Sequence, residues 1–73
     1  MNQKQLGSII LYCIGSTDKP VDWSTIRYEV DRAGWEPTPK QDWMFVRGAL
    51  QALINAGFIV RTNDVRNEQY ILS

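Results

Sequence analysis

The sequence contains no histidine and only one cysteine, Cys13. Without histidine, the chain can form neither a His-containing zinc site nor a His-based acid–base pair. A lone cysteine can form no internal disulfide and no thiolate cluster, and its place on an apolar helix face favours a small buried residue. A glycine-rich phosphate loop and a nucleophile motif are also missing. We therefore expect no enzyme and no cofactor or metal.

Excess charge and long apolar runs are missing as well. Eight basic and eight acidic residues give a net charge of zero. Domains that bind nucleic acids gain much of their affinity by neutralising phosphates, and this chain has no bulk excess of positive charge for that purpose. The apolar run at residues 9–14 is too short to span a bilayer, which takes about 20 residues, or to act as a signal peptide. We expect a cytoplasmic protein that does not enter a membrane.

The chain does contain enough apolar residues for one small domain. It has 73 residues, of which 44% are hydrophobic, and we expect residues 1–73 to form a single domain. Apolar residues recur at the i, i+3, i+4 spacing of a helical face in three segments. These predict helices at residues 2–14, 22–33 and 39–56.

Capping residues mark the ends of these helices. Asn2 and Asp22 are suitable N-caps for the first two. Thr38 precedes Pro39 and is followed three residues later by Gln41, which is the pattern of a capping box with proline at the first helical position. Glycine follows each helix, as is common at the C′ position; the three are Gly15, Gly34 and Gly57.

Two segments near the end of the chain are rich in β-branched and aromatic residues. Residues 58–62 and 68–72 are predicted strands, and residues 63–67 supply the turn between them. We expect an antiparallel hairpin that packs against the helices, since an isolated hairpin is only marginally stable in water. The fold class is therefore α+β.

This order of elements resembles the winged helix-turn-helix superfamily. The residues that carry the resemblance are ALQALINAGFIVR at positions 49–61, where the third helix ends and leads into the wing. The entry to the second helix at residues 21–23 is similar too, because a short β-bridge often precedes that helix in the family. The resemblance covers nearly the whole chain and implies a small winged helix: three helices followed by a two-stranded hairpin wing. The segment at residues 35–46 is longer than the family's tight turn.

The resemblance also implies a function. It indicates a small protein that binds double-stranded DNA, such as a transcriptional or recombination accessory factor of bacterial or phage type. The protein would bind alone, as a homodimer or beside another protein. The third helix would enter the major groove and the wing would touch the backbone or the minor groove. Acidic residues Asp42, Asp64 and Glu68 lie among the basic ones and reduce their field. The candidates are Lys40, Gln41, Arg47 and Gln51 for the groove, with Arg61 and Arg66 for phosphates.

A protein–protein interaction module that keeps the fold but does not bind DNA is the alternative. Trp43 and Phe45 are two residues apart on a helix, so both cannot face inward. At least part of Trp43, Met44 and Phe45 is therefore exposed, and aromatic residues and methionine are enriched at protein interfaces. The family's usual base-reading positions fall on Met44, Phe45 and Gly48, which are not polar. We expect Trp23 and Trp35, by contrast, to lie in the core.

Overall fold

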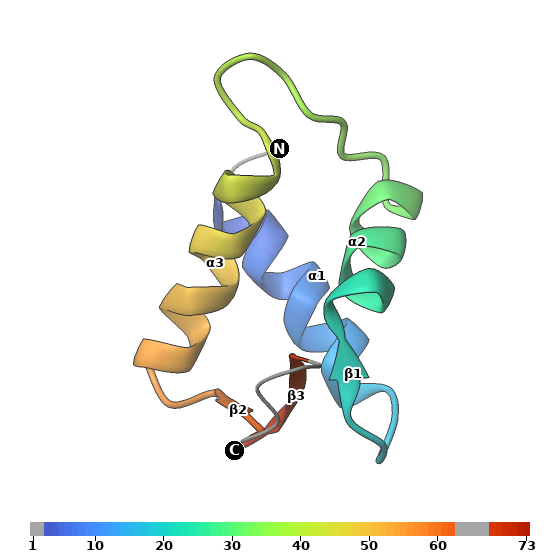
Figure 1. The fold of residues 1–73 in the computed structure, drawn as a ribbon, viewed down its shortest axis with the longest axis vertical. Helices are drawn as coiled ribbons and strands as arrows, with labels where there is room; N and C mark the ends of the chain where they lie inside the picture. Colours follow the sequence, from blue (N-terminus) through green and yellow to red (C-terminus); the bar gives the residue numbers. More distant parts are fainter. Residues whose placement is uncertain (1–2, 63–67) are drawn as a thin grey trace.

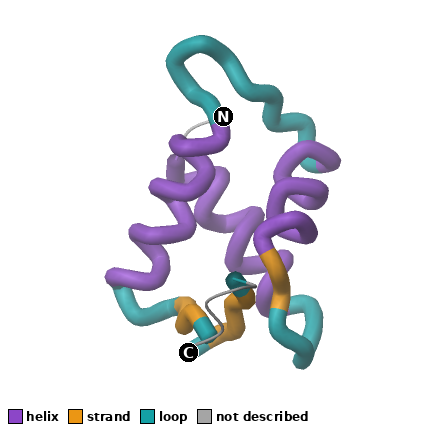
Figure 2. Tube along the Cα trace, viewed as in Figure 1, coloured by secondary structure: helices purple, strands orange, loops and turns teal. Residues whose placement is uncertain are grey.

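Three helices stand on one face of a small sheet in the computed structural model, which describes residues 3–62 and 68–73. Helix α1 lies between α2 and α3, the sheet lies at one end of the helices, and the α2–α3 loop lies at the other (Figure 1; Figure 2). Within the described residues, no helix is long and apolar enough to cross a membrane. The helices are α1 (Gln3–Gly15), α2 (Trp23–Arg32) and α3 (Trp43–Asn55), and the strands are β1 (Val21–Asp22), β2 (Ile59–Arg61) and β3 (Gln69–Leu72).

The sheet is antiparallel, with three strands in the order β1-β3-β2. Val21 pairs with Tyr70, and Arg61 pairs with Tyr70 from the other side. The predicted α+β class is confirmed, but the two-stranded hairpin is wrong because it omits β1. A strand of two residues is too short to show an alternating pattern, so only the family resemblance indicated a bridge there. The predicted turn at residues 63–67 and the Asn2 cap lie outside the described residues.

The core lies where the helices meet the inner face of the sheet. Helix α1 buries Leu6, Ile10 and Ile14, which lie on one face because they are four residues apart. This helix contacts α2, α3 and β3, so its buried face joins all the other layers. The remaining elements complete the core with Cys13, Val21, Ile26, Val30, Trp35, Val46, Ala49, Leu50, Ile59 and Tyr70.

Helices α2 and α3 end in the same way. Gly34 and Gly57 have φ angles of 100° and 85°, a left-handed conformation that glycine adopts without strain. In each case the glycine and the aromatic residue after it donate main-chain hydrogen bonds back into the last turn, which is a Schellman motif. Gly15 differs from the prediction, because it belongs to α1 and its φ is not positive. A Cβ there would lie 3.3 Å from Leu72, so this glycine instead allows β3 to approach closely.

The start of α3 also differs from the prediction. The helix begins at Trp43, with Asp42 as its N-cap, and not at Pro39. Thr38 Oγ1 does accept a hydrogen bond from the Gln41 N–H at 2.9 Å, but the Thr38 N–H donates to the Gln41 carbonyl, also at 2.9 Å. The capping pattern therefore closes an isolated turn, since the bond that caps a helix can also stabilise a turn without one. Lys40 and Gln41 are consequently loop residues.

Asp22 joins the sheet to α2, because it is both the last residue of β1 and the predicted N-cap of the helix. Its Oδ1 accepts hydrogen bonds from the main-chain N–H and the hydroxyl of Thr25, both at 2.8 Å. Both bonds lower the pKa of Asp22 from its ordinary value of 3.8, and the bond from the main-chain N–H has the larger effect. The charged carboxylate is thus the form that the fold favours.

Replacing Asp22 tests this joint. We expect Asp22→Ala to lower the free energy of unfolding by about 1 kcal/mol at neutral pH, and Asp22→Asn to retain most of that stability, because asparagine caps helices equally well. The folded-state pKa of Asp22 lies below the unfolded-state value of about 4. The contribution of the charge to stability is therefore fully present above the unfolded-state pKa and is lost as the pH falls through the folded-state pKa. Urea unfolding at neutral and acidic pH measures both effects. A deficit of Asp22→Ala that did not shrink on acidification would contradict the role of the charge.

Candidate functional site

The outer face of α3 carries a stripe of exposed residues. Met44, Gly48, Gln51 and Asn55 are exposed and follow one another at helical spacing, while the opposite face packs into the core. The Gln51 Nε2 donates to Asn55 Oδ1 at 2.9 Å, so two amide side chains lie together near the end of the helix. The stripe is uncharged, and its middle has no side chain.

A cluster of charged residues lies beside this stripe, between α3 and the sheet. The Glu68 carboxylate accepts hydrogen bonds from Arg47 Nη1 and from the Tyr70 hydroxyl, both at 3.0 Å, and Arg61 Nη2 lies 3.5 Å from its other oxygen. Two guanidinium groups from different elements are therefore held on one carboxylate. A hollow of about 300 Å³ opens here. It is lined by Met44, Arg47, Gly48, Leu50, Gln51, Ile54, Arg61, Glu68 and Tyr70.

Tryptophan rings support two of the arginines. The ring of Trp43 lies 4.8 Å from that of Trp35 and 6.5 Å from that of Trp23, in an edge-on arrangement with the latter. The guanidinium of Arg47 lies 4.2 Å from the centre of the Trp23 ring, and that of Arg27 lies 4.5 Å from the centre of the Trp43 ring. Cation–π contacts of this kind fix the direction of long side chains. Arg47 is thus held from two sides, by an aromatic ring and by a carboxylate.

Ionisation in the cluster follows from these contacts. The hydrogen bond from Arg47, followed by that from Tyr70, lowers the pKa of Glu68 from its ordinary value of 4.5. Burial raises the pKa of Tyr70 from 10.0, and the bond to Glu68 adds to the shift. At neutral pH the cluster therefore holds one negative and two positive charges, and the phenol is an uncharged donor. The local charge is one positive unit on a chain whose net charge is zero.

The structure brings together some of the predicted DNA-contacting residues. Arg47 and Arg61 share Glu68, and Gln51 lines the same hollow. Lys40 and Gln41 do not join them, because they lie in the α2–α3 loop at the end of α3 that is remote from the sheet (Figure 1). Arg66 lies outside the described residues.

The three residues of the predicted protein interface are placed differently from one another. Met44 is 70% exposed, which confirms that part of this segment faces solvent. Trp43 and Phe45 are half-buried and pack against the core. Trp35 is buried, as expected, whereas Trp23 is only half-buried.

Two residues of this region were absent from the predicted site. Tyr70 lies in the predicted strand at residues 68–72, and Arg27 lies in the predicted helix at residues 22–33. Arg27 stacks on Trp43 of another helix, and Tyr70 joins the site through Glu68, whose partner Arg47 lies 21 positions away. Glu68 itself was expected to weaken the field of the basic residues, and its ion pairs with both arginines confirm this.

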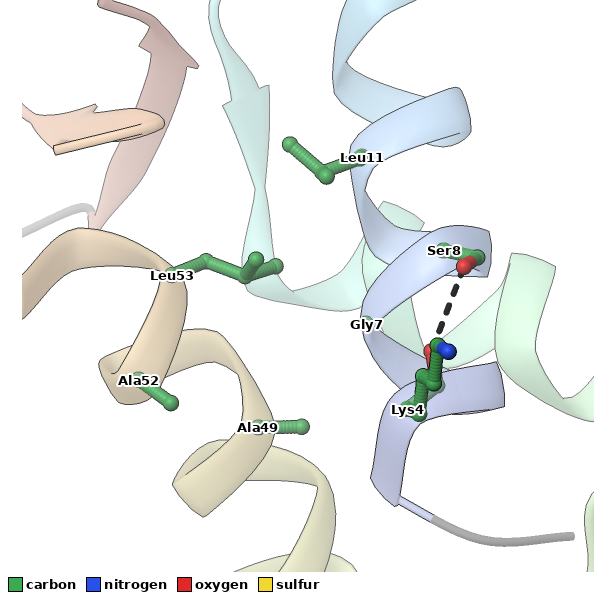
Figure 3. Close-up of a pocket in the computed structure, with 7 residues that line it drawn as sticks. All are labelled: Lys4, Gly7, Ser8, Leu11, Ala49, Ala52 and Leu53. Carbon is green, nitrogen blue, oxygen red and sulfur yellow. Dashed lines mark hydrogen bonds between the residues drawn. The ribbon is translucent and has the colours of Figure 1, made fainter. Parts of the chain in front are cut away.

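Elsewhere on the described surface lies an apolar groove. A groove of about 400 Å³ runs between α1 and α3, where Leu11, Ala49 and Leu53 point into the space between the helices (Figure 3). The Ser8 hydroxyl at its rim donates to the Lys4 carbonyl at 3.2 Å.

Cys13 is buried, as predicted, and burial raises the pKa of its thiol. Among the described residues, no group of three histidine, cysteine, aspartate or glutamate residues could hold a metal ion.

Comparisons with protein-family models, with curated proteins and with solved structures found no match to this chain. The geometry of the α3 stripe and of the cluster beside it is therefore the basis for a proposed function.

Proposed function

We propose that this protein binds double-stranded DNA, with the outer stripe of α3 in the major groove and Arg61 of β2 against the phosphate backbone. The observation that carries the proposal is the convergence of Arg47 and Arg61 on one carboxylate beside an exposed, uncharged helix face. Arginine binds phosphate through two parallel hydrogen bonds, and two such groups side by side suit a sugar–phosphate backbone.

The dimensions and side chains of α3 agree with this arrangement. Its 13 residues extend about 20 Å, and an α-helix with its side chains is about 10–12 Å across, which suits a major groove about 12 Å wide. The missing side chain at Gly48 allows the helix backbone to approach the base edges closely. Gln51 carries the amide that pairs with adenine, and the exposed Met44 can contact a thymine methyl group.

Because the whole chain is neutral, its affinity must come from local placement of charge and not from bulk excess. Lys40, exposed in the loop before α3, provides a cation at the far end of the helix from Arg61. Contacts at both ends of α3 would orient it along the groove. A monomer with so few phosphate contacts binds weakly, and its binding is sensitive to salt.

Single alanine variants test the proposal. We expect Arg61→Ala to bind a labelled mixed-sequence duplex about eightfold more weakly at 0.1 M salt, and to reduce the slope of log K against log salt by about 0.9, since one phosphate contact is lost. Arg47→Ala should act similarly. Arg32→Ala is the matched control, because Arg32 is an exposed arginine on α2 that lies outside the cluster. Fluorescence anisotropy at several salt concentrations measures these values, and equal binding by wild type and Arg61→Ala would contradict the proposal.

Binding to a protein partner is the second candidate, and one observation favours it. Met44 is highly exposed beside a hollow whose two arginines are partly neutralised by Glu68. Under this function the wild type would not bind duplex DNA even at low ionic strength. Met44→Ala would then abolish binding to the partner, while Arg61→Ala would leave it unchanged.

A further inference from the structure

We propose that Glu68 is an internal competitor of DNA phosphate, and that it sets the affinity of the DNA-binding surface by occupying Arg47 and Arg61 when no DNA is bound. This inference depends on the proposed function and adds a regulatory role for a residue that would not itself contact DNA. The carboxylate then limits how tightly the two arginines can bind DNA.

The geometry of the carboxylate is that of a substitute phosphate. One oxygen of Glu68 accepts from Arg47 and Tyr70, and the other faces Arg61. A phosphodiester also presents two anionic oxygens to nearby donors, and guanidinium groups bind carboxylate and phosphate with the same planar fork. The two guanidinium groups that hold Glu68 are therefore the donors that a phosphate would use.

Exchange of the two anions is feasible because the pairs are not buried. The side chains of Arg47 and Arg61 are 41% and 49% exposed, and that of Glu68 is 30% exposed. Ion pairs this accessible to solvent contribute little to stability, so the arginines can leave the carboxylate without disrupting the fold. Stacking on Trp23 would still keep Arg47 in place after it had left Glu68.

Glu68 would oppose binding even after the exchange. The Tyr70 hydroxyl still donates to the carboxylate and keeps it beside the arginines. Its low pKa keeps it charged at neutral pH, so an incoming phosphate would meet a fixed negative charge at short range. Removing this charge, while keeping the shape and one acceptor oxygen, should therefore strengthen binding.

The experiment compares Glu68→Gln with the wild type in titrations of a mixed-sequence duplex. We expect Glu68→Gln to bind about eightfold more tightly at 0.1 M salt, the effect of about one unit of charge, because the carboxylate that competes for the two arginines and repels the phosphate is removed. Asp18→Asn is the matched control, since Asp18 is an exposed acid in the α1–β1 loop and its replacement changes the net charge equally. It should bind like the wild type.

The possible results separate this inference from the function on which it rests. If the wild type binds DNA but Glu68→Gln binds no more tightly, Glu68 is not a competitor, although the DNA-binding function stands. Weaker binding by Glu68→Gln would also overturn the inference, since it would make Glu68 a residue that positions the arginines. If Asp18→Asn gained as much affinity for DNA as Glu68→Gln, the effect would come from the net charge of the chain and the inference would fail. If no variant binds DNA at low salt, the proposed function itself fails.

Discussion

Replacement of Trp35 by alanine should remove a large part of the stability of this protein. We expect the free energy of unfolding to fall by about 3–5 kcal/mol, the usual effect of truncating a large buried aromatic residue. Trp35 is 3% exposed and packs on Trp43, the first residue of α3. The stability of a domain of 73 residues is roughly 4–11 kcal/mol in total, so this variant would lose from about a quarter to all of it.

Trp35→Phe is the matched control for this prediction. The indole Nε1 of Trp35 is buried and has no hydrogen-bond partner among the described residues. Phenylalanine keeps an aromatic ring against Trp43 and removes this unpaired donor, which in general costs about 1–3 kcal/mol to bury. We therefore expect Trp35→Phe to be much more stable than Trp35→Ala. Urea unfolding followed by circular dichroism measures both, and a similar midpoint for the two variants would contradict the role of ring packing.

Reversal of both arginine charges should abolish DNA binding. In Arg47→Glu/Arg61→Glu the loss of two phosphate contacts alone weakens binding about 60-fold at 0.1 M salt, and two new carboxylates beside Glu68 repel the backbone in addition. If Arg47→Glu disturbs the stacking on Trp23, which circular dichroism would reveal, Arg61→Glu alone provides the same test. Anisotropy with a labelled duplex measures the loss.

A second double variant controls for net charge in that experiment. Lys19→Glu/Arg32→Glu changes the charge of the chain by the same amount, but at the α1–β1 loop and at the end of α2. It should bind DNA far more tightly than the reversal in the cluster. Equal losses in both variants would show that only the total charge matters, and that α3 and β2 form no specific surface.

Much of the fold could be predicted from local signals in the sequence. Asp22, Gly34 and Gly57 mark helix ends through hydrogen bonds to residues within a few positions, and these bonds are present. The errors arose where a local signal has two outcomes. The Thr38 pattern stabilises either a helix start or an isolated turn. The helix begins later, where Asp42 caps it and Trp43 packs against Trp23 and Trp35.

The candidate site was less predictable for a related reason. The helical spacing of α3 places Met44 and Gln51 on its outer face, and this could be expected from the sequence. The grouping of Arg47 and Arg61 on Glu68 could not, because it depends on the angle at which α3 lies across the sheet. Contacts such as Arg27 over Trp43 likewise join helices whose relative orientation no local pattern fixes.

The most direct test of the proposed DNA-binding surface is a titration of the wild-type protein into a labelled mixed-sequence duplex, from low ionic strength to physiological salt. Contacts from Arg47 and Arg61 predict binding that is tightest at the lowest salt and weakens as salt is added, with a slope of log K against log salt of about −1.8 or steeper. No binding at low ionic strength, or binding that salt does not weaken, would contradict a phosphate-contacting surface on α3 and β2.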